Sequence, residues 1–136
     1  MENHRNAAKA FIVRNGKLLL IKRRPNDVHK PGAWDIPGGR LEPGEDPYEG
    51  LKREAFEEIS GEIKIIMPID VHHFTRDDGQ KITLTIFLCD PVFAEIRLSD
   101  EHTEYKWLDL KAEIGEFPNW LHGPIKRVLE YNLIKQ

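Results

Sequence analysis

The apolar residues in the first part of the chain fall into short runs of strand length. Residues 7–13 (AAKAFIV) and 17–23 (KLLLIKR) form two such runs. Asn15-Gly16 between them supplies the positive φ angles that a tight hairpin turn requires. Residues 24–34 contain Pro, Asn and Gly, which is typical of a loop. The pattern therefore predicts a β-hairpin followed by a loop.

Two longer β-rich runs occupy the middle of the chain, at residues 62–74 and 81–89. The turn residues Asp77-Asp78-Gly79 lie between them. In the second run the apolar residues alternate with threonines, so one face of this strand is expected to be the more deeply buried. The alternating apolar residues are Ile82, Leu84, Ile86 and Leu88.

Three shorter runs predict further strands. Residues 34–37 (WDIP) precede the glycine pair Gly38-Gly39, which is expected to close that strand. Residues 92–98 (VFAEIRL) and 104–110 (EYKWLDL) are the other two.

The clearest helix signal begins at Asp46. Asp46 is a good N-cap, Pro47 suits the first turn, and Glu49 completes a capping box. The helix is expected to run to about Ser60, with Gly61 as its C-terminal stop.

A second helix is predicted over residues 118–135, with Gly123-Pro124 near its start or at a kink. Strands interrupted by one central helix and closed by another indicate a mixed α/β sandwich. A length of 136 residues fits one compact domain, residues 1–136.

Composition narrows the classes of protein. The net charge of −3 gives no broad basic field, which argues against duplex nucleic acid as a partner. No apolar run approaches the roughly 20 residues of a membrane span, and the N-terminus lacks the apolar core of a signal peptide. The single Cys89 suits a reducing compartment. We therefore expect a cytoplasmic protein that does not bind a membrane.

The central helix carries an unusual acidic face. Glu54, Glu57 and Glu58 fall within roughly 100° on the helical wheel, and the apolar residues lie on another face. Like charges at this spacing each cost about 0.2–0.5 kcal/mol on an exposed helix. The apolar face consists of Tyr48, Leu51, Ala55 and Ile59.

Two interpretations of this face are open. It is either a solvated acidic surface or a site where a hard divalent cation neutralises the carboxylates. No lysine is interleaved among the glutamates to relieve them, and the preceding loop, residues 38–45, is glycine-rich and suited to close backbone approach. Both features favour a site for Mg²⁺ or Mn²⁺.

The run from Gly39 resembles a known family motif. Gly39, five residues, Glu45, seven residues and then Arg53-Glu54-Ala55-Phe56-Glu57-Glu58 match the Nudix box of the MutT-like hydrolases. The lead-in GAWDIPGG and the downstream SDEHTEYKWLDL also resemble the family. The chain departs from the motif at its end, where Ser60 and Gly61 place the glycine one residue late.

The resemblance implies a Nudix α/β/α sandwich with a mixed β-sheet and a role for each matching residue. Glu57 and Glu58 would be the main metal ligands, with Glu54 a further ligand or the general base. The carbonyl of Gly38 could supply another ligand. Arg53 would orient the carboxylates. The remaining residue of the motif, Glu45, would support the site structurally.

The general base of this family is not fixed in one place. Glu101 and Glu104 are therefore candidates for a base or an extra ligand, while Glu54 is the candidate within the box. A surface position beside an edge strand explains Glu101 and Glu104 equally well.

Other residues are candidates for substrate binding. Arg23 and Arg24 could hold phosphate groups, although exposed cations at a strand end are an equal alternative. Phe74 could stack on a nucleobase. Trp34 could do the same, but core packing is the interpretation favoured for it.

The resemblance implies hydrolysis of a nucleoside diphosphate linked to another group, with Mg²⁺ required. A nucleoside triphosphate, modified or not, is the substrate expected by elimination. The alternative is a catalytically silent Nudix-fold module that binds nucleotides and regulates a partner. A Nudix-fold isopentenyl diphosphate isomerase lacks a suitably placed cysteine. The partner expected is a small-molecule nucleotide, and a homodimer stays open.

Overall fold

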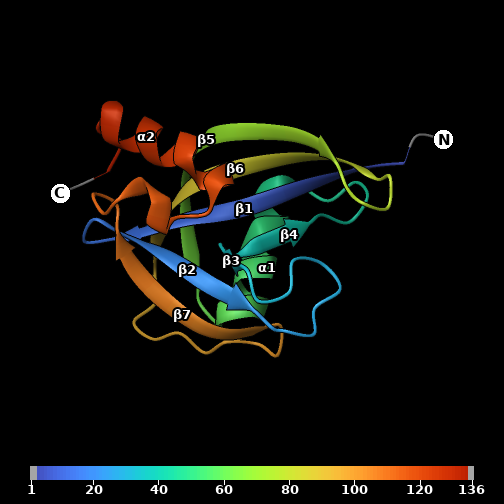
Figure 1. Ribbon diagram of the computed structural model, residues 1–136, viewed down its shortest axis with the longest axis horizontal. Coiled ribbons are helices and arrows are strands. Elements are labelled where there is room, and N and C mark those ends of the chain that lie inside the picture. The colour runs from blue at the N-terminus through green and yellow to red at the C-terminus, as the bar shows by residue number, and fades with distance from the viewer. Residues whose placement is uncertain (1–2, 135–136) are drawn as a thin grey trace.

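The computed structural model describes residues 3–134 and confirms the mixed α/β architecture. Seven strands form one sheet with the order β3-β2-β1-β6-β5, while β4 pairs with β1 and β7 pairs with β2. Figure 1 shows the long strand β1 running through the middle of the molecule. The elements are β1 (His4–Arg14), β2 (Lys17–Arg23), β3 (Trp34–Asp35), β4 (Gly38–Arg40), α1 (Pro47–Ile59), β5 (Ile63–Thr75), β6 (Lys81–Pro91), β7 (His102–Asp109), the 3₁₀ turns η1 (Ile114–Glu116) and η2 (Asn119–Leu121), and α2 (His122–Glu130).

The sheet is mixed because β1 and β6 are parallel while the other pairs are antiparallel. Over its first part, β1 has β6 on one side and β4 on the other. At its end it turns to pair with β2 through Val13 and Arg14. The sheet therefore divides into two branches, one with β5 and β6 and the other with β2, β3 and β7. Strand β4, which begins with the glycine pair, lies where they separate.

Apolar side chains pack on both faces of the sheet. One core cluster joins Leu51, Ala55 and Ile59 of α1 to one face of β1. The other joins Ile125 and Val128 of α2 to the opposite face. A helix on each face gives the predicted α/β/α sandwich (Figure 1). Tyr48, predicted on the apolar face of α1, is half-exposed and packs its ring against Phe87.

The predicted hairpins are confirmed. Asn15 and Gly16 have φ angles of 52° and 75° between β1 and β2. The turn before β6 contains Gly79 at φ 86°. The alternation is confirmed in the first part of β6, where Ile82, Leu84 and Ile86 are buried and Thr83 and Thr85 are half-buried. From Ile86 to Cys89 both faces of the strand are buried.

The strand predicted over residues 92–98 is wrong. These residues form a loop that runs past the C-terminal end of α1 and hydrogen-bonds to it. The backbone N–H of Arg97 donates to the carbonyl of Ile59, at 3.0 Å. The N–H of Ser99 donates to the carbonyl of Glu58, at 2.9 Å. The last carbonyls of a helix need partners, and here they take the N–H groups that a strand would give to a sheet.

The ends of α1 differ in detail from the prediction. Asp46 caps the N-terminus as expected, accepting from the N–H groups of Tyr48 and Glu49, but the Glu49 side chain pairs with Lys52. At the other end Ser60, not Gly61, takes the left-handed conformation, with φ 56°. A Cβ on Gly61 would lie 2.5 Å from the Phe93 ring, so this glycine provides space. Contact with the Phe93 ring therefore accounts for a glycine at position 61, one residue later than in the motif.

The closing helix is shorter than predicted. η2 precedes it, and α2 begins at His122 with Gly123-Pro124 in its first turn, then ends at Glu130. The predicted end at Lys135 lies outside the described residues. Within residues 3–134 no helix is long and apolar enough to cross a membrane. A single domain over residues 1–136 stays a prediction.

Candidate metal and nucleotide site

Glu58 is the buried member of the acidic face. Its carboxylate Oε1 accepts a hydrogen bond from the backbone N–H of Gly38, at 2.8 Å. Gly38 has φ 128°, and a Cβ there would lie 2.2 Å from the carbonyl oxygen of Ala8. Only glycine therefore allows β4 to approach β1 this closely while presenting its N–H to Glu58.

The pKa of Glu58 is raised to about 8, mainly by burial and to a smaller extent by the neighbouring carboxylates of Glu54 and Asp35. The nearby Lys9 ammonium and the Gly38 hydrogen bond lower this pKa, but burial prevails. An ionised Glu58 in this position lacks sufficient positive charge around it. A bound cation would supply that charge.

Arg53 connects the other carboxylates of the motif. Its guanidinium binds Glu45 through two hydrogen bonds of 2.9 Å each. It also contacts Glu57 at 3.2 Å and Glu54 at 3.4 Å. Glu45 also accepts a hydrogen bond from the backbone N–H of Glu42. The carboxylate that holds Arg53 is therefore itself bound to the loop backbone. These contacts fit the orienting role expected of Arg53 and the structural role expected of Glu45.

Glu54 lies between like charges. Burial, assisted by the carboxylates of Glu57 and Glu101, raises the pKa of Glu54, while Arg53 lowers it. Glu54 also lies close to β4, since a Cβ on Gly39 would be 3.6 Å from its Oε2. Glu54, Glu58 and the glycine pair thus form one small region at the branch of the sheet.

The chemistry of this donor set fits a hard divalent cation, because it offers several carboxylates with too little compensating charge. Within residues 3–134 no three His, Cys, Asp or Glu side chains are already arranged to hold an ion. The reason is that Glu57 is more than half exposed and is hydrogen-bonded to Arg53. Glu57 would have to rotate toward Glu54 and Glu58 to become a ligand.

The two candidate bases outside the motif occupy different places. Glu101 lies close enough to raise the pKa of Glu54. Glu104 is exposed on β7 and pairs with Lys22, at 3.4 Å. The structure therefore brings Glu101 toward the acidic site and leaves Glu104 on the other face of β7.

The two arginines after β2 also differ. Arg23 is occupied by protein groups, since it contacts Asp27 at 3.0 Å, Asp35 at 3.3 Å and the carbonyl of His29 at 2.9 Å. The Arg24 guanidinium is 39% exposed, and its buried Nε has no hydrogen-bond partner. Arg24 is thus the better placed of the two to bind a phosphate group.

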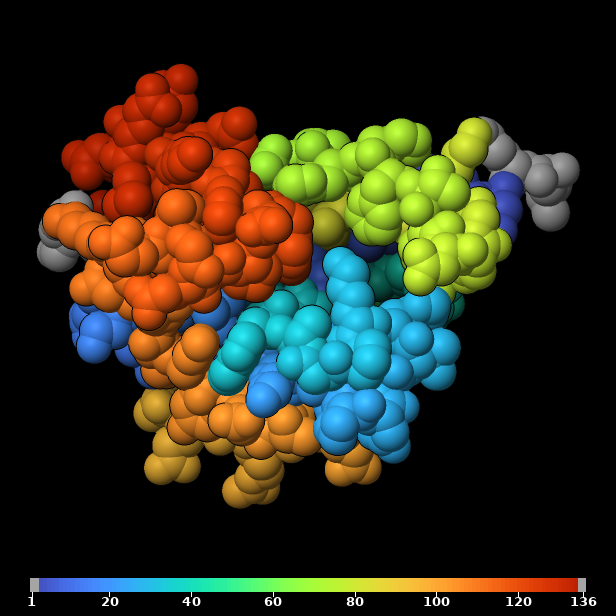
Figure 2. All heavy atoms as spheres, in the orientation of Figure 1, coloured from blue at the N-terminus to red at the C-terminus, as the bar shows by residue number. Residues whose placement is uncertain are grey.

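An open cleft of about 360 Å³ lies on the α2 side of the sheet, and two tryptophans, Trp34 and Trp120, line it. In Figure 2 the 24–34 loop lies beside the segment around η2, the two parts of the chain that line this cleft. Trp34 also packs against the core, which is the interpretation favoured for it, and base stacking by this residue stays a prediction. Phe74 does not line the cleft. The full lining is Lys30, Ala33, Trp34, Glu116, Phe117, Pro118 and Trp120.

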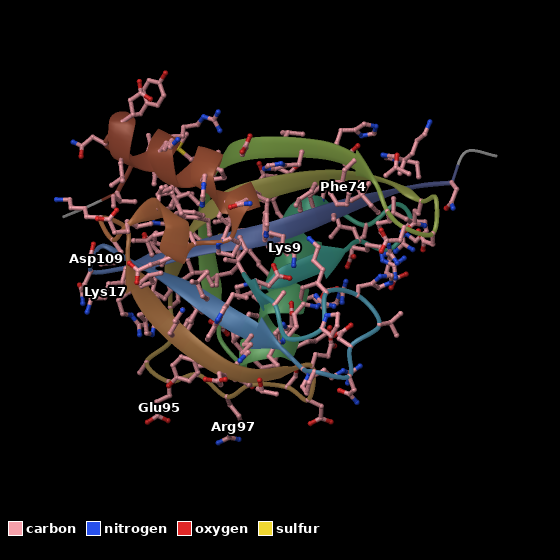
Figure 3. The ribbon with its side chains drawn as sticks, viewed as in Figure 1. Lys9, Lys17, Phe74, Glu95, Arg97 and Asp109 are labelled. Carbon is pink, nitrogen blue, oxygen red and sulfur yellow. The ribbon has the colours of Figure 1, made fainter. Side chains whose placement is uncertain are left out.

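Sequence reasoning missed two buried polar residues, Asp35 and His102, and the largely buried Lys9. Lys9 lies near the centre of the molecule (Figure 3) and bonds Asp35 at 2.9 Å. His102 points at Glu58, its Nε2 lying 3.6 Å from Oε2. A lysine inside the apolar run AAKAFIV was the one available signal, because a buried lysine needs an anionic partner.

The comparisons with known proteins agree with this geometry. The NUDIX domain family matches residues 3–129, nearly the whole chain. The chain belongs to the Nudix hydrolase family. A MutT-like protein of Streptomyces ambofaciens is 33% identical over 77% of this Nudix chain and 64% of its own length. The nucleoside triphosphatase NudI of Escherichia coli K12 is 33% identical over 72% of this chain and 77% of its own length.

The fold is also that of solved Nudix proteins. The crystal structure of a MutT protein from Methanosarcina mazei superposes with a TM-score of 0.84 at 28% identity, covering 96% of each chain. The predicted α/β/α sandwich is therefore confirmed as a Nudix fold.

The burial of Glu58 predicts how the stability of the metal-free protein depends on pH. Its folded pKa of about 8 exceeds the ordinary value of 4.5, so the folded state keeps a proton that the unfolded chain loses as pH rises between these values. The stabilisation is complete below about 4.5 and is lost as pH rises to about 8. Glu58→Gln has no proton to lose and should gain in melting temperature relative to wild type from pH 5 to pH 8, measured in EDTA.

Glu49→Gln is the matched control, because Glu49 is exposed on the same helix. Its melting temperature should follow that of the wild type across this range. A constant difference between Glu58→Gln and wild type from pH 5 to pH 8 would contradict the burial of a costly carboxylate.

Proposed function

We propose that this Nudix protein is a Mg²⁺- or Mn²⁺-dependent pyrophosphohydrolase acting on a nucleoside diphosphate linked to another group. The observation that carries the proposal is the buried Glu58 carboxylate beside Glu54, whose pKa values are both raised by burial. Such a pair is costly unless a cation compensates it.

The proposed ligands are Glu54, Glu57 and Glu58, with the carbonyl of Gly38 as a further one. A divalent cation bound there would neutralise charge that develops on the phosphoryl oxygens and lower the pKa of water. Arg53 keeps the carboxylates oriented through its fixed bonds to Glu45. When Glu57 turns toward a cation, the hydrogen bonds to Glu45 still hold Arg53.

The open cleft is the proposed site for the nucleoside. Two tryptophans line it, and a base could stack on them if it displaced the lysines over their rings, Lys106 at 4.2 Å from the Trp34 ring centre and Lys30 at 5.8 Å from that of Trp120. Arg24, whose Nε makes no hydrogen bond and only a 3.8 Å contact with Asp27, is proposed to bind phosphate. Phe74 and Arg23 are weaker candidates, because Phe74 does not line the cleft and Arg23 is bound by two aspartates.

A nucleoside triphosphate is the proposed substrate. The relative from Escherichia coli carries the name nucleoside triphosphatase, and the cleft on this chain has the aromatic faces that a nucleoside needs. Homodimer formation and a cytoplasmic location stay predictions.

A nucleotide panel tests this function. Purified protein should convert a (d)NTP to the monophosphate and pyrophosphate with Mg²⁺ or Mn²⁺, and EDTA should abolish the reaction. ADP-ribose, dinucleoside polyphosphates and nucleotide sugars complete the panel, with products separated by chromatography. Glu58→Gln should lose more than the roughly 10- to 100-fold typical of residues that support a metal ligand, while Glu49→Gln should not.

Undiminished turnover in EDTA would overturn the metal requirement. Nucleotide binding without turnover of any compound on the panel would instead support the silent regulatory module.

The placement of the two outer glutamates predicts unequal effects. Glu101→Ala should lower kcat because Glu101 approaches Glu54, where a base or an aligning group acts in the transition state. Glu104→Ala should leave kcat unchanged, because Glu104 faces Lys22. Steady-state kinetics on the best substrate measures both. Full kcat in both variants would place the base within the motif, at Glu54.

A further inference from the structure

His102 is buried against Glu58 although neither residue is close to the other in sequence. Among residues 3–134, the buried polar or charged residues are Asp35, Glu58 and His102. The side chains of His102 and Glu58 are 2% and 7% exposed, and His102 Nε2 lies 3.6 Å from Glu58 Oε2. The other ring nitrogen, Nδ1, is buried without a hydrogen-bond partner. A histidine in this position needs a reason beyond packing.

A break in the strand pairing directs His102 toward Glu58. Lys22 lies opposite Glu104, but Arg23 lies opposite His102, so Thr103 is an extra residue on β7. Residues directly opposite on paired strands share a face of the sheet. His102 therefore lies on the face of Arg23, and Glu104 lies on the other face with Lys22. Bulges beside functional sites commonly turn a side chain in this way.

The backbone around His102 is fixed to the same helix that carries Glu58. Ser99 donates its N–H to the carbonyl of Glu58 and accepts at its own carbonyl from the N–H of His102, at 3.3 Å. The loop thus contacts Glu58 through its backbone while the imidazole contacts it through its side chain. The backbone bonds and the side-chain contact together fix the position of the His102 imidazole relative to the Glu58 carboxylate.

The contacts indicate which ring nitrogen carries the proton. A neutral imidazole has one donor and one acceptor nitrogen. When Glu58 is ionised, as a metal ligand must be, a hydrogen on Nε2 points at a carboxylate oxygen, whereas a hydrogen on Nδ1 would be a buried donor without a partner. An unpaired acceptor at Nδ1, together with the attraction at Nε2, is the lower-energy choice.

We propose that His102 is a positioning residue that orients the Glu58 carboxylate for metal binding. The N–H of Gly38 donates to Oε1, and the Nε2 of His102 lies 3.6 Å from Oε2, so a protein group faces each oxygen of the carboxylate and a small shift of the imidazole would complete the second hydrogen bond. The remaining lone pairs are left for the cation. Residues that orient a ligand in this manner typically change metal affinity by about 10- to 100-fold. The inference rests on the metal role of Glu58 in the proposed function.

The test measures Mn²⁺ binding to the protein without nucleotide, by the electron paramagnetic resonance signal of free Mn²⁺. His102→Leu and His102→Asn should each weaken binding by about 10-fold or more. Asparagine stays polar but is too short to place a donor at the position of Nε2. His102→Gln reaches that position and should retain most of the affinity. His73→Leu is the control, because His73 is an exposed histidine bonded to Thr83.

A double-mutant cycle with Glu58→Gln separates positioning from a structural effect. If His102 acts through Glu58, the double variant Glu58→Gln/His102→Leu should bind Mn²⁺ no more weakly than Glu58→Gln alone. Melting temperatures in EDTA show which variants are folded, and the Asn variant replaces the Leu variant in the cycle if the latter does not fold.

Wild-type affinity in both the Leu and Asn variants, or additive losses in the double variant, would overturn the positioning role and leave the metal site intact. Failure of the wild type to bind Mn²⁺, or unchanged binding by Glu58→Gln, would overturn the proposed metal site and the positioning role together.

Discussion

The site depends on one interaction, the hydrogen bond from the backbone of Gly38 to the buried carboxylate of Glu58. It joins helix α1 to β4 at the point where the sheet divides. It requires glycine, because any Cβ at Gly38 would overlap the backbone of Ala8. The bond alone does not balance the burial of the carboxylate, whose pKa is raised to about 8. Ionising Glu58 in the folded protein therefore costs free energy, and the proposed cation would offset that cost.

The charges around Glu58 form a graded arrangement. Toward the interior, Lys9 pairs with Asp35, so that this cation is already largely balanced. Toward solvent, Arg53 binds Glu45 and Glu57 and also contacts Glu54, whereas Glu58 at the inner end has no contact with Arg53. The carboxylate with the least positive charge around it is therefore that of Glu58, at the inner end of the site. This gradient explains why the motif pairs one arginine with several glutamates.

Local patterns predicted the elements, and the missed features are those that depend on tertiary contacts. The N-cap at Asp46 and the hairpin at Asn15-Gly16 are short-range signals and were confirmed. Residues 92–98 are β-rich, yet the N–H of Arg97 binds the last carbonyl of α1 and the N–H of Ser99 binds the one before it, a competition that no local pattern reveals. His102 was missed because it precedes the predicted strand at residues 104–110, and only the bulge at Thr103 turns it to the face opposite that of Glu104. The acidic face was found, but the difference in burial between Glu57 and Glu58 became visible only once the sheet lay against the helix.

The most direct test of the metal site is a crystal structure of the protein soaked with Mn²⁺, with anomalous diffraction data collected at the manganese edge. The account predicts an anomalous peak within coordination distance of carboxylate oxygens of both Glu54 and Glu58, at the branch of the sheet. A crystal that contains Mn²⁺ only at surface carboxylates, with Glu58 still bonded solely to protein groups, would contradict it.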